Sequence, residues 1–365
     1  MIRKTLRITV ITVLTGFIIL FASCTSTQPS TPHAKNIIFL IGDGMGLNQL
    51  VAAHTVKKGN LAITSVSHIG LQTNQSANNY ITDSAASGTA LACGKKTNNG
   101  AIGVDAEQNE LVSILKIAEA NNKSTGLVST SAITHATPAA FIANEESRNN
   151  YEAIAADFLK TDIDVFIGGG MNHFASRADG RDLTEELRSN GYAVYSQMAD
   201  LDAHTSGNVA ALLAPMHIPR ILDGRGDMLP KATKKAIELL NQNENGFFVM
   251  IEGSQIDWGG HANDEEYVIS ETIDFDEAVR VALDFAKKDG ETLVVVTADH
   301  ETGGMHILKG NMEAGTVESV FATGGHTGVM IPVYAYGPGA EYFTGFFDNT
   351  EFKSKFLAIS EMKEE

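Results

Sequence analysis

Short apolar runs alternate with segments of helical character along most of the chain, and this alternation constrains the fold more than any other feature of the sequence. The apolar runs cover residues 37–41, 126–129, 165–167, 247–251, 293–296 and 332–336, and the helical segments cover residues 110–121, 151–160, 230–241 and 264–288. Apolar strands separated by helices are typical of a parallel sheet with both faces covered. No internal repeat and no shift of composition marks a second domain. We therefore predict an α/β fold, a single domain with a mostly parallel central sheet covered by helices on both faces.

The charge of the chain narrows the classes of ligand. The chain has 365 residues and a formal net charge of −17, because 27 lysines and arginines stand against 44 aspartates and glutamates. Such a surface repels polyanions, so we expect no nucleic-acid binding. An anionic substrate needs a local positive centre, supplied by clustered basic residues or by metal ions. Cys24 and Cys93 are too few for a disulfide framework.

The first residues are predicted to be a signal peptide of the lipoprotein type over 1–23. Three basic residues precede an uncharged apolar run at 8–22, which is short for a membrane-spanning helix. The run ends in Leu-Phe-Ala-Ser before Cys24, which resembles a bacterial lipobox, and a polar tether over 24–35 follows. The alternative is an ordinary signal peptide followed by a chance cysteine. We expect an exported protein, periplasmic or at the cell surface, that contacts the membrane only through a lipid anchor at Cys24 and has its catalytic domain over 36–365.

Residue types that bind metal ions follow three of the predicted strands, at the carboxyl ends where parallel sheets bind ligands. An aspartate lies between glycines after 37–41, an Asp-His pair follows 293–296, and a glutamate, then an aspartate and a histidine four residues apart, follow 247–251. A further histidine lies among glycines at 324–328. These residues are Asp43, Asp299, His300, Glu252, Asp257, His261 and His326. Imidazole and carboxylate groups suit zinc, and carboxylate and hydroxyl oxygens suit magnesium, so we predict a metal centre here. Taken singly, the Asp43 and Asp299-His300 motifs are also compatible with simple turns.

Two further residues fit a phosphate site. Ser84 is predicted to be the N-cap of a helix of small residues, and a helix N-terminus favours an anion. Arg148 can hold phosphate oxygens with its planar guanidinium. Taken singly, Ser84 is a capping serine and Arg148 a solvated surface arginine. The metal-type ligands at several strand ends favour the functional interpretation of both.

The ordered motifs resemble those of alkaline phosphatases, most of all the compact, short-looped bacterial enzymes, some of which are cold-active. They lie at 43–46, 82–87, 134–138, 252–261, 297–304 and 325–328, and they span nearly the whole mature chain. The resemblance implies the alkaline phosphatase fold, a homodimer, and small phosphate monoesters as substrates.

The resemblance also implies a role for individual residues. Ser84 would be the nucleophile, Arg148 the residue that holds the phosphate, and Asp83 the residue that orients the arginine. The metal sites implied are a first zinc site of Asp257, His261 and His326, a second zinc site of Asp43, Asp299 and His300, and a magnesium-type site of Asp43, Thr137 and Glu252.

His135 and Trp258 depart from the enterobacterial pattern, in which an acid and a basic residue stand at these positions. In the family both positions surround the third metal and the phosphate. The departures leave the reaction class intact, but they leave the metal preference of the third site and the pH optimum open.

The expected reaction is hydrolysis of phosphate monoesters through a phosphoserine at Ser84, with two zinc ions and one magnesium ion. A phosphodiesterase or phosphonate hydrolase of the same superfamily is the close alternative. Glu252, Thr137 and Arg148 favour the monoesterase because they suit a dianionic terminal phosphate. A non-catalytic phosphate- or metal-binding lipoprotein is the alternative from another class, and it would not need Ser84. A sulfatase is disfavoured because no C-x-P-x-R sequence surrounds Ser84.

Overall fold

The computed structural model describes residues 33–364. The predicted signal peptide, Cys24 and the tether up to residue 32 lie outside the described residues. Among the residues that are described, no helix has both the length and the apolar character needed to cross a membrane.

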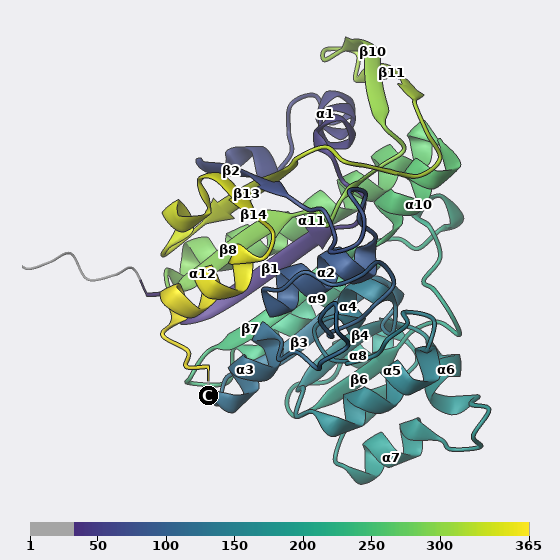
Figure 1. The fold of residues 1–365 in the computed structure, drawn as a ribbon, viewed down its shortest axis with the longest axis vertical. Coiled ribbons are helices and arrows are strands. Elements are labelled where there is room, and N and C mark those ends of the chain that lie inside the picture. Colours follow the sequence, from purple (N-terminus) through teal and green to yellow (C-terminus); the bar gives the residue numbers. More distant parts are fainter. Residues whose placement is uncertain (1–32, 365) are drawn as a thin grey trace, which may run out of the picture. The chain divides into compact units, whose positions relative to one another are not determined.

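A ten-stranded sheet forms the centre of the fold, with the strand order β14-β2-β13-β8-β1-β7-β3-β4-β6-β5 (Figure 1). The strands are β1 (Asn36–Gly42), β2 (His68–Thr73), β3 (Ser124–Ala132), β4 (Val165–Gly169), β5 (Ala193–Tyr195), β6 (Val209–Leu212), β7 (Phe247–Gly253), β8 (Thr292–Thr297), β13 (Ile331–Tyr336) and β14 (Gly345–Asp348). In this sheet β13 runs antiparallel to both of its neighbours, β8 and β2, and the other pairings are parallel. The predicted mostly parallel sheet is therefore confirmed.

Helices cover both faces of the sheet, as predicted (Figure 1). One face packs against α2 (Ser84–Cys93), α3 (Ile114–Ala120), α5 (Tyr151–Asp157) and α12 (Glu351–Ser360), and the other against α1 (Leu47–Val56), α9 (Met228–Leu240) and α11 (Glu265–Asp289). In β1, Phe39 and Ile41 enter the first core, whereas Ile38 and Leu40 enter the second. Because successive strand residues point to opposite faces, a strand buried on both sides must be apolar throughout.

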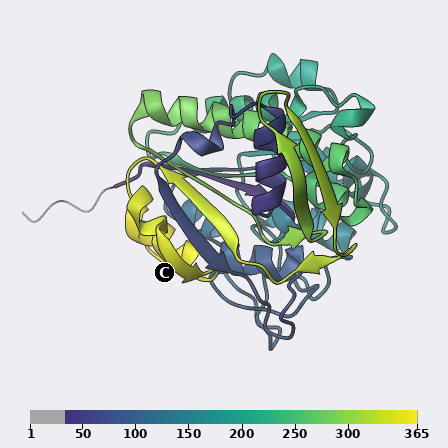
Figure 2. The same cartoon turned by 90° about the horizontal axis from the view of Figure 1, so that it is seen from above.

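Shorter elements complete the chain. They are η1 (Ile63–Ser65), α4 (Ala136–Ala139), η2 (Phe158–Lys160), α6 (Met171–Ala175), α7 (Leu183–Ser189), α8 (Met198–Asp202), η3 (Ile221–Asp223), α10 (Gln255–Ala262), β9 (Glu301–Thr302), β10 (Met305–Asn311), β11 (Thr316–Phe321), β12 (His326–Thr327) and η4 (Ala340–Phe343). The antiparallel β10–β11 hairpin lies beside α1 (Figure 2). Strands β9 and β12 form a separate two-stranded ladder.

The six apolar runs all lie in strands, and the four helical segments correspond to α3, α5 with η2, α9 and α11. In the central sheet, strands β2, β5, β6 and β14 were not predicted, and neither were the short strands β9 to β12 outside it. In β2 the apolar residues Ile69 and Leu71 are exposed, whereas Gly70 and Gln72 are buried. The apolar residues of this strand therefore do not mark its buried face, and the sequence gives no strand signal here.

A buried ion-pair network fixes the segment that follows β6. The side chains of Arg225, Glu271 and Asp274 are at most 7% exposed, and Arg225 Nη2 lies 2.7 Å from Asp274 Oδ2 and also pairs with Glu271. Burial raises the pKa of Asp274 to about 6, although Arg225 opposes this shift. The amide of Ile221 donates to Glu271, and the Ile218 carbonyl accepts a hydrogen bond from Gln255 at the start of α10. The network therefore links the segment that follows β6 to α11, and the Gln255 hydrogen bond links it to α10, the helix that carries the predicted metal ligands Asp257 and His261.

Candidate active site

The predicted metal ligands converge because the central strands β8, β1 and β7 are neighbours. Their carboxyl ends carry Asp299 and His300, Asp43, and Glu252, in that order. Helix α10 follows β7 and contributes Asp257 and His261. The β9–β12 ladder pairs Thr302 with His326 and so brings the last histidine to the same edge.

The first cluster consists of Asp257, His261 and His326. Both Nε2 atoms face Asp257 Oδ1, at 3.3 Å for His261 and 3.5 Å for His326, and they lie 3.2 Å from each other. Each Nδ1 faces a backbone carbonyl, of Gly324 at 2.7 Å and of Thr82 at 2.8 Å. A carbonyl at Nδ1 fixes the ring so that Nε2 is available to a metal ion.

The second cluster consists of Asp43, Asp299 and His300, all fully buried. His300 Nε2 lies 3.3 Å from Asp299 Oδ2 and 3.5 Å from Asp43 Oδ1. Burial raises the pKa of Asp43 well above its ordinary value, and the neighbouring Asp299 raises it further. Burial likewise raises the pKa of Asp299 to about 6.

The third cluster consists of Asp43, His135 and Glu252. His135 was predicted only to surround the third site, and the structure places it among the possible ligands. Thr137, a predicted ligand, is fully buried on α4. Burial raises the pKa of Glu252 to about 7, against the opposing effect of a hydrogen bond from Ser254.

Several buried atoms of these clusters have no hydrogen-bond partner within residues 33–364. They are both carboxylate oxygens of Asp43, Asp299 Oδ2, Glu252 Oε1, Thr137 Oγ1 and His135 Nδ1. Buried polar groups are normally paired, and buried carboxylates are paired or bind metal ions. The residues present therefore fit divalent metal ions, which would supply the missing partner and the missing positive charge.

Ser84 is the first residue of α2, not its N-cap as predicted. The N-cap is Asp83, whose Oδ1 accepts a hydrogen bond from the Ala86 amide at 3.0 Å. A carboxylate is favoured at this place because it also interacts with the positive end of the helix dipole. The Ser84 hydroxyl is consequently not used for capping, and its Oγ lies 3.2 Å from His300 Nε2, beside the second cluster.

The hydroxyl of Ser87, one turn further along α2, already makes two hydrogen bonds. It donates to the Asp299 carbonyl at 2.7 Å and accepts from Asn349 Nδ2 at 3.1 Å. Of these two serines, Ser84 is therefore the one whose hydroxyl is placed to react.

Arg148 is held against Asp83, the residue that precedes Ser84. Its Nη1 lies 3.1 Å from Asp83 Oδ2, and its Nη2 lies 3.3 Å from His135 Nε2. The other oxygen of Asp83 caps α2, so one carboxylate orients both the arginine and the helix that carries Ser84. This contact supports the predicted orienting role of Asp83.

Trp258 and His135 lie together around a residue that the sequence did not indicate, His217. The His217 ring is 4.7 Å from that of Trp258 and 5.8 Å from that of His135, both edge to face. His217 Nδ1 accepts a hydrogen bond from the Ala132 amide at 3.0 Å. His217 follows β6 in a loop without any motif, so only the fold reveals its position.

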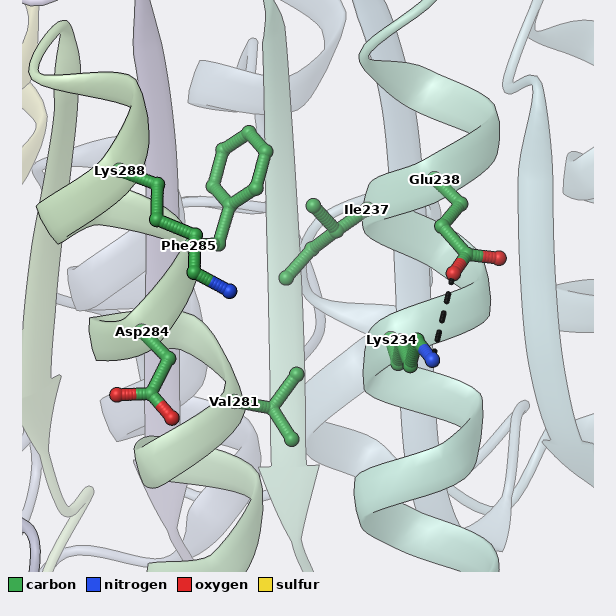
Figure 3. A pocket seen from close by; sticks show the side chains of 7 residues that line it. All are labelled: Lys234, Ile237, Glu238, Val281, Asp284, Phe285 and Lys288. Carbon is green, nitrogen blue, oxygen red and sulfur yellow. Dashed lines mark ion pairs between the residues drawn. The ribbon is translucent and has the colours of Figure 1, made fainter.

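The groove between α9 and α11 is a separate feature (Figure 3). It encloses about 290 Å³ and is lined by Lys234, Ile237, Glu238, Val281, Asp284, Phe285 and Lys288. Lys234 there faces Glu238 at 3.8 Å. None of its lining residues belongs to the three metal-type clusters, so it is not the reactive site.

Comparison with known proteins agrees with the geometry. The model of the alkaline phosphatase family matches residues 34–320. Alkaline phosphatase 3 of Bacillus subtilis is 36% identical, with 89% of each chain covered, and the Escherichia coli alkaline phosphatase is 34% identical, with 88% of this chain and 85% of the relative covered.

Solved structures give the same result. Alkaline phosphatase from the Antarctic bacterium TAB5 is 42% identical and has a TM-score of 0.86 over 92% of this chain and 100% of that one. A histidine-to-aspartate mutant of the TAB5 enzyme, with magnesium in its M3 site, is 41% identical with the same coverage and TM-score. The family match, these relatives and the fold show that the chain belongs to the alkaline phosphatase family, whose members are metal-dependent enzymes that hydrolyse phosphate monoesters.

Proposed function

We propose that the chain hydrolyses phosphate monoesters through a phosphoserine at Ser84, with zinc ions in the first and second clusters and a magnesium-type ion in the third. The position of the Ser84 hydroxyl supports this most directly, because it lies 3.2 Å from His300 Nε2 and takes no part in capping α2. Bound zinc supplies the charge that lets a hydroxyl or a water molecule lose a proton near neutral pH.

The proposed reaction has two displacements at phosphorus. Ser84 Oγ forms a bond to phosphorus, the bond to the ester oxygen breaks, and the alcohol leaves with a proton. Water then attacks the same phosphorus, the bond to Oγ breaks, and inorganic phosphate leaves while Ser84 regains its proton. Arg148, held by Asp83, is placed to bind phosphate oxygens with paired N–H groups in both steps.

The proposal is tested against the diesterase alternative with one metal-loaded preparation. We expect hydrolysis of p-nitrophenyl phosphate to exceed that of bis(p-nitrophenyl) phosphate by about 100-fold or more in kcat/KM, a difference of about 2.7 kcal/mol. A preference for the diester would contradict the monoesterase assignment. Binding of phosphate without turnover of either ester would favour the non-catalytic alternative.

The identity of the third metal ion depends on His135. Its neutral nitrogen is a softer ligand than an acid and favours zinc or cobalt over magnesium. We expect His135→Asp to tighten magnesium binding by about tenfold, equivalent to about 1.4 kcal/mol. Titration of magnesium into zinc-loaded protein measures this effect, and His135→Asn is the neutral control. Equal tightening in the asparagine variant would show that the carboxylate charge is not the cause.

Trp258 provides an N–H group but no charge, and its ring lies beside that of His135, which in turn contacts Arg148. A lysine here would add a positive charge near the bound phosphate. We therefore expect Trp258→Lys to lower the inhibition constant for inorganic phosphate by about fivefold, which corresponds to about 1 kcal/mol. Trp258→Phe is the neutral control. An unchanged inhibition constant in the lysine variant, with metal content intact, would make Trp258 a packing residue.

We also propose that Cys24 carries the lipid anchor of an exported protein, supported by the sequence before and after it. One acyl chain binds membranes only marginally, so stable attachment needs more than one. We expect Cys24→Ala to move the protein from the membrane fraction to the soluble fraction and to abolish incorporation of labelled fatty acid, whereas Thr25→Ala retains both. A mature N-terminus mapped to another residue would reject the anchor.

A further inference from the structure

The hydroxyl of Thr302 lies between ligands of two different metal-type clusters. Its Oγ1 is 2.5 Å from Asp257 Oδ1 in the first cluster and 3.2 Å from His300 Nδ1 in the second. Thr302 is fully buried, so water does not compete for these contacts. One side chain thus contacts both zinc clusters.

The directions of the two hydrogen bonds of the Thr302 hydroxyl follow from the hydrogens that its partners can donate. A threonine hydroxyl has one hydrogen, and an ionised carboxylate accepts only. The Thr302 hydrogen therefore points to Asp257, and its oxygen accepts from His300 Nδ1. This places the ring hydrogen of His300 on Nδ1 and leaves the lone pair on Nε2.

That tautomer is the one the second cluster needs. His300 Nε2 is the atom that faces Asp43 Oδ1, Asp299 Oδ2 and the Ser84 hydroxyl. With the hydrogen on Nε2 instead, His300 could not bind a metal ion in this cluster. The Thr302 hydroxyl is therefore placed to select the binding form of the ring.

The backbone holds the hydroxyl where it is. The Thr302 amide donates to the Gly44 carbonyl at 3.1 Å, and Thr302 pairs with His326 in the β9–β12 ladder. A side chain at residue 44 would come within 2.8 Å of Thr302 Oγ1, and one at residue 260 within 2.7 Å of the Thr302 carbonyl oxygen, so glycine at both positions allows this approach. Threonine is also β-branched, which restricts rotation about χ1.

We propose that Thr302 is a positioning residue that couples the two zinc sites, orienting Asp257 for the first and fixing the His300 tautomer for the second. The proposal rests on the zinc sites of the proposed function, but it concerns binding of the metal and is independent of the substrate. Partners of metal ligands typically contribute 10–100-fold to metal affinity, about the effect expected here.

Three variants separate the hydroxyl from the packing. Thr302→Val keeps the shape and removes the hydroxyl, and Thr302→Ser keeps the hydroxyl. Thr272→Val is the matched control, because Thr272 is also fully buried but its hydroxyl donates to the Val268 carbonyl within α11. Zinc affinity is measured by competition with a chromophoric chelator, without substrate.

We expect Thr302→Val to weaken zinc binding about 10–100-fold at both sites, Thr302→Ser to recover most of the affinity, and Thr272→Val to bind zinc like the wild type. Wild-type affinity at both sites in Thr302→Val, or a loss confined to one site, would overturn the coupling while the proposed function stands. A wild-type protein that binds no zinc would reject the proposed function itself.

A second measurement uses the wild-type chain alone and does not depend on the folding of any variant. Nitrogen-15 chemical shifts of the His300 ring in the metal-free protein report which nitrogen carries the hydrogen. We expect the hydrogen on Nδ1. A ring with the hydrogen on Nε2 would overturn the proposal.

Discussion

Ser84→Ala is expected to lower kcat about 10⁴-fold or more, while the fold and the metal content stay intact. Loss of a nucleophile removes the covalent route entirely, and in other hydrolases with a serine nucleophile it costs a factor of this order or larger. The substitution is expected to disturb the fold little because Asp83 caps α2 and, within residues 33–364, the Ser84 hydroxyl makes a hydrogen bond only with His300. Stability is therefore expected to change by less than about 1 kcal/mol.

The position of the phosphoryl group tests the same assignment independently. Acid quenching during turnover, followed by mass spectrometry, is expected to find phosphate on Ser84 in the wild type and no phosphopeptide from α2 in Ser84→Ala. Ser87→Ala is the control, because the Ser87 hydroxyl is bound to the Asp299 carbonyl and to Asn349. Phosphate found on Ser87, or a Ser84→Ala variant within tenfold of wild-type turnover, would contradict the assignment of Ser84 as the nucleophile.

The central part of the fold and most of the site could be predicted because they depend on local patterns. Residues 37–41 of β1 are all apolar because their side chains enter two cores in alternation, and this pattern is visible in the sequence. Asp43 and Asp299 lie within two residues of the ends of such strands, and the carboxyl ends of neighbouring parallel strands meet at one edge. Their convergence therefore follows from the fold class.

Other parts depend on contacts between distant segments, which a linear pattern does not contain. Thr302 meets Asp257 across 45 positions, and His217 meets Ala132 across 85. The error at the start of α2 has a different cause. Both Asp83 and Ser84 are good N-caps, and in the fold Asp83 is also held by distant groups, because its second oxygen accepts hydrogen bonds from the Gly100 amide and from Arg148.

Removal of the metal ions is expected to abolish hydrolysis and to lower stability by an amount that grows as the pH rises from 7 to 9. Each zinc site contributes about 4 kcal/mol when free zinc exceeds its Kd by 1,000-fold, so chelation should lower the Tm at any pH in this range. The pH dependence has a separate origin in the first cluster. The hydrogen bond to Asp257 raises the pKa of His261 to about 9. Burial alone would lower the pKa of His326, but the hydrogen bond and charge of Asp257, the Thr82 carbonyl and the charge of Asp299 together raise it.

The sign follows from proton binding. In the metal-free folded chain these two histidines hold protons above their unfolded pKa of 6.5, so the folded state binds more protons than the unfolded state. Their stabilising effect is complete below pH 6.5. The part due to His261 is lost as the pH rises through about 9, and the part due to His326 is lost as the pH rises through its own raised pKa. The pKa of Glu252 is raised to about 7, so its contribution to the stability of the metal-free protein is also lost as the pH rises, mainly around pH 7. A bound metal ion replaces these protons, so the loaded protein lacks this dependence.

Melting curves at pH 7, 8 and 9, with excess zinc and with chelator, measure both effects. We expect the difference in Tm between the two states to widen steadily with pH. His261→Gln removes one of the two titrating rings and should flatten the metal-free curve, whereas His306→Gln changes a histidine outside the three clusters and should not. Parallel curves with and without zinc would contradict this account, because carboxylates and imidazoles that hold a cation must exchange protons for it when the cation leaves.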